Sequence, residues 1–102
     1  MTVHQAAIEL AVQEIGYESV YDYAAEKLRD SLLAEIKISL DAVAVFEKKY
    51  GMDYIRFRSQ FFELTQFALF EREDDSMDWS AELEQLRLLE KRLAQLLPNA
   101  IS

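Results

Sequence analysis

The sequence predicts an all-α protein of about four amphipathic helices, one of them long. Glycine occurs twice and proline once in 102 residues, so few residues would interrupt a helix. Apolar residues make up 51% of the chain, and they recur at spacings of three and four, the period of one helical face. A chain of this length forms one small domain, and small helical proteins often complete their cores by self-association. We therefore expect a homo-oligomer.

The first predicted helix covers residues 3–15. Its apolar positions follow helical spacing, and they are Val3, Ala7, Leu10 and Ile15, with Ile8 and Val12 beside them. Gly16 suits the left-handed conformation that ends a helix. Ser19 is the expected N-cap of the next helix, and Asp22 would favour the dipole of its first turn.

A second, long helix is expected from about Val20 to Lys49, since no glycine or proline interrupts that stretch. One alternative remains open. Residues 35–40 alternate polar and apolar, which is strand periodicity, and Asp41 could then cap a short helix. We favour the continuous helix, because a lone strand would lack a pairing partner.

The chain is expected to reverse at Gly51. The lysines at 48–49 suit a helix C-terminus, and Gly51 suits the left-handed position after it. Asp53 would cap the next helix, with Met52 and Phe57 at the spacing of a hydrophobic staple.

A third helix is predicted from Tyr54 to about Phe70. Its apolar positions form a wide arc, and they are Tyr54, Phe57, Phe61, Leu64 and Ala68, flanked by Ile55, Phe62 and Leu69. Such an arc indicates cover on two sides, by the chain itself and by a second subunit or a partner.

Residues 71–78 hold five acids and are predicted to form a solvated loop. Either Ser76 or Asp78 would cap a last helix from Trp79 to Leu97, closed by Pro98, with residues 99–102 frayed. The seam of this helix is heptad-like and consists of Trp79, Leu83, Leu86, Leu89, Leu93 and Leu96. The chain thus divides into an N-terminal helical pair, residues 1–50, suited to dimerisation, and residues 51–102, suited to partner binding.

Catalytic chemistry is not expected. His4 is the single histidine, cysteine is absent, and no phosphate-binding glycine motif occurs. We predict no enzyme, no catalytic residue, no cofactor and no metal site. From Glu71 the acids fall at positions resembling an EF-hand loop, but Ser76 stands where that loop requires glycine, so a solvated loop is preferred.

The formal net charge of -8 opposes binding to phosphate backbones and favours a basic protein partner. Lysines and arginines gather near the reversal, and they are Lys48, Lys49, Arg56 and Arg58. They could contact nucleic acid, but helix-end charge and surface ion pairing fit the acidic chain better, so we expect no nucleic-acid binding. The absence of cysteine, of a signal peptide and of a long apolar run predicts a cytoplasmic protein with no membrane association.

Two stretches resemble small prokaryotic antitoxins of toxin–antitoxin modules. Residues 16–32, beginning Gly16-Tyr17-Glu18-Ser19, are similar to the turn and second helix of ribbon-helix-helix antitoxins. Residues 46–52, Phe57, the acidic run and Met77-Asp78-Trp79 look like the C-terminal part of antitoxin-type proteins. The resemblance implies a dimer whose C-terminal region neutralises a toxin, often a ribonuclease. Only residues 1–3 stand before the first predicted helix, so we expect the DNA-reading strand of that family to be absent, and no base-contacting residue is carried over.

The leading hypothesis is an antitoxin-like inhibitor that binds a basic protein by helix docking. The expected partner-binding residues are apolar and aromatic, since large aromatics dominate interface energies, and they are Tyr54, Phe57, Phe61, Phe62, Trp79, Leu83 and Leu86. A self-assembling structural or adaptor protein is the alternative, and an acidic mimic of nucleic acid is a third.

Overall fold

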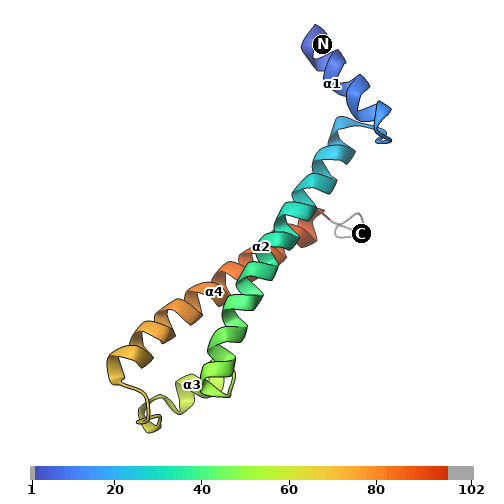
Figure 1. Ribbon diagram of the computed structural model, residues 1–102. Coiled ribbons are helices and arrows are strands. Elements are labelled where there is room, and N and C mark those ends of the chain that lie inside the picture. Colours follow the sequence, from blue (N-terminus) through green and yellow to red (C-terminus); the bar gives the residue numbers. More distant parts are fainter. Residues whose placement is uncertain (1, 97–102) are drawn as a thin grey trace.

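The computed structural model describes residues 2–96, and its regular elements in that range are helices joined by short turns (Figure 1). Their order is α1 (Val3–Glu14), α2 (Val20–Tyr50), α3 (Tyr54–Ser59), the short 3₁₀ helix η1 (Phe61–Glu63) and α4 (Leu69–Leu96). The all-α prediction is confirmed. The predicted helix end at Leu97, the closing Pro98 and the frayed residues 99–102 lie outside the described residues.

The connection between α1 and α2 has the helix caps that the sequence predicts. Ile15 caps the end of α1, and Gly16 follows with φ of +101°. The hydroxyl of Ser19 accepts a hydrogen bond of 3.1 Å from the backbone N–H of Asp22. Ser19 therefore satisfies one of the unpaired donors at the start of α2, as expected.

The helix α2 runs without interruption through residues 35–40, so the continuous-helix prediction is confirmed and the strand is not formed. Its buried side chains lie at helical spacing and are Ile36, Ser39, Val43 and Tyr50. Ile36 faces inward, whereas Ile38 and Leu40 are exposed. The polar–apolar alternation of residues 35–40 therefore arises because one apolar residue of this stretch faces the core and two others lie on the surface.

The reversal at Gly51 and the N-cap at Asp53 are confirmed. Gly51 has φ of +71°, and its N–H donates to the carbonyl oxygen of Glu47 over 2.7 Å. Two residues later, the Asp53 carboxylate accepts a 2.8 Å hydrogen bond from the N–H of Arg56. Gly51 and Asp53 thus end α2 and begin α3 within a few residues.

The prediction of one helix from Tyr54 to Phe70 is wrong, because α3 ends at Ser59. The Ser59 hydroxyl donates to the carbonyl of Arg56, and the chain then tightens into η1 and a turn. Three side chains spaced by three residues follow: Phe61 and Leu64 are buried and Phe67 packs against the same core. The break in the helix after Ser59 thus allows all three side chains to reach one core.

The acidic run at residues 71–78 is not a loop but lies within the first three turns of α4. Neither Ser76 nor Asp78 is a cap, and α4 begins ten residues before Trp79. The inward positions of this segment are Arg72 and Ser76, both buried. Because polar residues occupy these inward positions, the apolar period that marks a helix is absent from the sequence here. A helix also rules out the EF-hand loop geometry.

The helices α2 and α4 form an antiparallel hairpin closed at one end by α3 and η1 (Figure 1). At the far end, the Arg29 guanidinium donates to the carbonyl of Leu96 over 3.3 Å. Beyond this point α1 and the first turns of α2 extend away from α4 (Figure 1); we call residues 2–28 the arm. The chain measures 65 × 29 × 20 Å, with a radius of gyration of 20.7 Å, against about 13 Å for a compact domain of this size.

None of the described helices is both long enough and apolar enough to cross a membrane.

Candidate partner-binding surface

The closed end of the hairpin holds a cluster of aromatic rings. Trp79 and Phe57 are fully buried at its centre. Tyr50 lies over both, with ring centroids 4.5 Å from Phe57 and 6.1 Å from Trp79, and Phe67 covers Tyr50 at 4.6 Å. The rings come from α2, α3, α4 and the turn before α4, so the cluster fixes how these elements meet.

An ionic cluster joins the end of α2 to the first turns of α4. The ammonium of Lys49 lies 2.7 Å from Asp75 and 2.8 Å from Glu71. The Tyr50 hydroxyl donates to the same Asp75 oxygen over 2.6 Å. Hydrogen bonds to Asp75 and Glu71 raise the pKa of Lys49, and burial followed by the Asp75 bond raises the pKa of Tyr50. Lys49 therefore serves the helix packing rather than an external anion.

Arg72 fastens the turn before α4 to that helix. Its Nε donates to the carbonyl of Phe67 over 3.0 Å, and its Nη1 donates to the carbonyl of Phe61. The guanidinium also lies 5.3 Å from the centroid of the Phe61 ring, within the range of a cation–π contact. One buried arginine thus satisfies two carbonyls of a segment that has little regular structure.

The predicted partner-binding residues divide by exposure. Phe57 and Trp79 are 0% exposed and Phe61 is 5% exposed, so their side chains lie in the core of this chain. Tyr54, Leu83 and Leu86 are half-buried, whereas Phe62 is 82% exposed. The wide apolar arc that suggested outside cover is explained largely by the turn at η1, which folds several of its members into one core.

Two hollows open on the surface around this core. The larger, about 410 Å³, is lined by Arg58, Phe61, Phe62, Glu73, Ser76 and Met77. Arg58 donates to the Ser76 hydroxyl over 3.2 Å, and its guanidinium lies 4.8 Å from the centroid of the Phe61 ring. Phe62 and Met77 are both exposed beside it. We call this the Phe62 hollow.

The smaller hollow, about 190 Å³, lies between α2, α3 and α4. It is lined by Val43, Glu47, Asp53, Tyr54, Ile55, Trp79 and Leu83. Ile55 is 81% exposed at its edge. We call this the Trp79 hollow. Tyr54, Phe61, Phe62, Trp79 and Leu83 thus line one hollow or the other, whereas Phe57 and Leu86 line neither.

Sequence reasoning missed several residues that line the hollows. Ile55 was placed only at the flank of a helical stripe, and Met77 inside a polar loop. Glu47 and Asp53 carry acid groups to the Trp79 hollow, but Asp53 was considered only as a cap. The sequence does hold a clue for Ile55. It is a large apolar residue two positions after the N-cap Asp53, and it is not part of the Met52–Phe57 staple.

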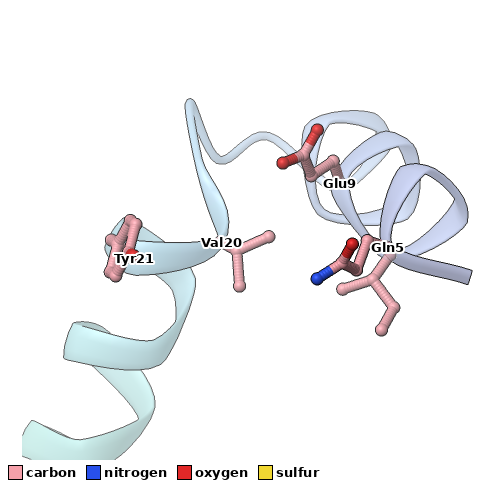
Figure 2. A pocket seen from close by; sticks show the side chains of 5 residues that line it. Gln5, Glu9, Val20 and Tyr21 are labelled. Carbon is pink, nitrogen blue, oxygen red and sulfur yellow. The ribbon is translucent and has the colours of Figure 1, made fainter. Parts of the chain in front are cut away.

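A third concave surface belongs to the arm. Figure 2 shows the groove of about 540 Å³ between α1 and the start of α2, lined by Gln5, Ile8, Glu9, Val20 and Tyr21. Val20 and Gln5 point into the space between the two helices (Figure 2). Tyr21 is strongly exposed, so the groove leaves apolar surface open to solvent.

Histidine and cysteine, the two residue types that most often carry metal or acid–base chemistry, are sparse here. His4 lies exposed on α1. Among residues 2–96, no group of three or more histidine, aspartate and glutamate side chains could hold a metal ion. The hollows instead present aromatic and aliphatic walls with a few charges at their edges.

Comparisons of the chain with protein-family models, with curated proteins and with solved structures found no match. The likeness to antitoxins therefore rests on the sequence stretches alone.

Proposed function

We propose that this protein is an antitoxin-like inhibitor that binds a basic protein in the cytoplasm, with a toxin of the ribonuclease kind as its target. The observation that carries the proposal is the closed end of the hairpin, where two hollows flank the aromatic core. Ile55 stands exposed beside one and Phe62 beside the other. Large apolar side chains that project beside a rigid core are good anchors for a protein interface.

The charge of the chain supports a basic partner. The net charge is -8, and acids line both hollows, with Glu73 in one and Glu47 and Asp53 in the other. Complementary charge would speed the encounter with a basic protein and discriminate against acidic ones. Binding of this kind requires no catalytic group.

A growth assay tests this proposal. The chain is co-expressed with the small basic protein encoded by the adjacent gene, and it should relieve the growth arrest that this protein causes alone. The double variant Ile55→Ala, Phe62→Ala should lose this relief. Both side chains are exposed, so folding should be unaffected.

Val45→Ala is the matched control, because Val45 is an exposed apolar residue on α2, away from both hollows. It should protect as the unaltered chain does. An adjacent gene that encodes no small basic protein, or toxicity that the chain does not relieve, would refute the proposal.

A second candidate, self-association without a toxin, is favoured by the arm. The face of α2 that packs on α4 continues beyond Arg29 to Leu28 and Tyr21, both exposed, and Tyr21 also lines the groove of the arm. Sedimentation should then detect an oligomer that dissociates when Leu28 is replaced by Glu. A monomer across a wide concentration range would exclude this candidate.

A further inference from the structure

We infer that the Trp79 hollow receives one basic side chain, arginine or lysine, from the protein partner. This inference rests on the proposed function for the source of the side chain. The binding site itself is argued from the size of the hollow, its walls and its charges.

The size of the hollow selects a single side chain. Its volume is about 190 Å³, below the roughly 300–1,000 Å³ of pockets that enclose small-molecule ligands. A cofactor or a metabolite would remain mostly outside. One long side chain projecting from another protein would fill it.

The walls suit the aliphatic stem of such a side chain. Leu83 and the edge of Val43 supply aliphatic surface, and the half-buried Tyr54 supplies an aromatic ring. The fully buried Trp79 ring lies behind that of Tyr54, with centroids 5.3 Å apart, nearly edge to face. Lysine and arginine bury their methylene stems along apolar surface while the charged head stays near water. A head placed near the Tyr54 ring gains a cation–π attraction.

The edge of the hollow supplies the opposite charge. Glu47 comes from α2 and Asp53 from the cap of α3. One Asp53 oxygen accepts the N–H of Arg56. Within residues 2–96, no salt bridge engages either carboxylate. Two carboxylates without an internal counter-charge beside one hollow would bind a guanidinium or ammonium group.

The neighbouring surface indicates a polypeptide as the source, in preference to a free amine. Ile55, 81% exposed, stands at the edge of the hollow. An apolar residue next to the basic side chain of a partner would cover it, whereas a small amine would leave it in water. Burying that surface would add to the affinity.

A titration of the purified 102-residue chain tests the inference. Trp79 is the single tryptophan and lines the hollow, so its one indole N–H resonance reports occupancy. The probe is a short capped peptide with one arginine beside a leucine. It should shift this resonance saturably, and the lysine peptide should do likewise. The peptide with neutral citrulline in place of arginine should bind at least tenfold more weakly.

Two variants remove one charge each while keeping the shape. Glu47→Gln should weaken the arginine peptide several-fold. Asp53→Asn should do the same, and asparagine preserves the N-cap. Glu90→Gln is the control, because Glu90 is an exposed acid of α4 that lines neither hollow, and it should leave binding unchanged.

Equal binding of the citrulline and arginine peptides, or an equal loss with Glu90→Gln, would overturn the inference. Binding of methylguanidine or spermidine as tightly as the peptide would overturn the assignment to a protein side chain. The titration uses defined peptides and no toxin. A negative titration would therefore refute the basic side-chain site without affecting the result of the growth assay. A negative growth assay would refute the proposed function without affecting the evidence for the site.

Discussion

At the scale of single residues, the Tyr50 hydroxyl is the most informative polar atom of the hairpin. It is held 2.6 Å from Asp75 in a buried position. We predict that Tyr50→Phe lowers the free energy of unfolding by about 1 kcal/mol. The loss stays moderate because Lys49 remains bonded to Asp75. Urea unfolding measures the change, with Tyr21→Phe, at an exposed position, as a control of unaltered stability.

Alkaline pH should destabilise the fold through the same cluster. Burial and the Asp75 bond raise the pKa of Tyr50, and the bonds to Asp75 and Glu71 raise the pKa of Lys49. A group with a raised folded-state pKa contributes stability that is complete below its unfolded pKa, about 10 for both types. That contribution is lost as the pH rises through the folded value.

Stability should therefore be level up to about pH 10 and then fall. The double variant Tyr50→Phe, Lys49→Met should fall less steeply in the same range. Unfolding free energies measured in urea across the alkaline range decide this. An unchanged slope in the double variant would show that other groups cause the loss.

Arg72 gives a second prediction at this scale. Its guanidinium bonds the carbonyls of both Phe61 and Phe67, and the single ammonium of lysine lacks that fork geometry. Arg72→Lys should cost about 1–3 kcal/mol, the penalty of leaving a buried polar group unsatisfied. Arg87→Lys alters an exposed ion pair with Glu84 and should leave the free energy of unfolding nearly unchanged, because water screens such pairs. Equal effects of the two changes would contradict this role.

At the scale of elements, the reversal at Gly51 rests on backbone conformation alone. A Cβ added to Gly51 would meet nothing within 4 Å, but φ is +71°. Gly51→Ala should therefore cost roughly 1–2 kcal/mol, the strain of a left-handed residue that carries a Cβ. Gly51→Asn should cost less, because asparagine tolerates this region. Thermal unfolding of the two variants tests the order, and a loss for asparagine as large as for alanine would contradict it.

The elements that could be predicted are those whose ends carry local signals. Ser19, Gly51 and Asp53 act through their own backbone neighbours, so the sequence nearby is sufficient to locate the limits of α2 and the start of α3. The end of α3 depends instead on where Phe61, Leu64 and Phe67 find the core. That is a tertiary effect, and helical spacing alone could not reveal it.

The start of α4 was missed for a related reason. Its buried face begins with Arg72 and Ser76, whose partners are a carbonyl pair and the side chains of Tyr54 and Arg58. Two acids of the same segment, Glu71 and Asp75, bond Lys49. A polar segment that packs by hydrogen bonds has the composition of a loop. The candidate site could not be fully predicted for the same reason. Whether Ile55 is exposed and Phe57 is buried depends on how α3 packs in the folded chain.

At the scale of the whole molecule, α1 and the hairpin should be separable. Val12 is the one buried side chain of α1, and the aromatic cluster involves none of the arm. We predict that a chain beginning at Ser19 keeps the hairpin, with an unfolding free energy within about 0.5 kcal/mol of the full chain. Trp79 fluorescence follows this transition. A red-shifted emission from the shortened chain in the absence of urea would show that the hairpin needs α1.

The hairpin also has a direction in which it can assemble. Its largest side chains lie at the closed end, where Tyr50, Phe57 and Trp79 are separated by the shortest stretches of chain. Closing a short loop costs less entropy than closing a long one. The contact between Arg29 and Leu96 spans 67 residues, so closing it directly from the unfolded chain costs the most entropy. Contacts between α2 and α4 would thus form first at the aromatic end and last near Arg29. On heating, the contacts near Arg29 would be the first to open.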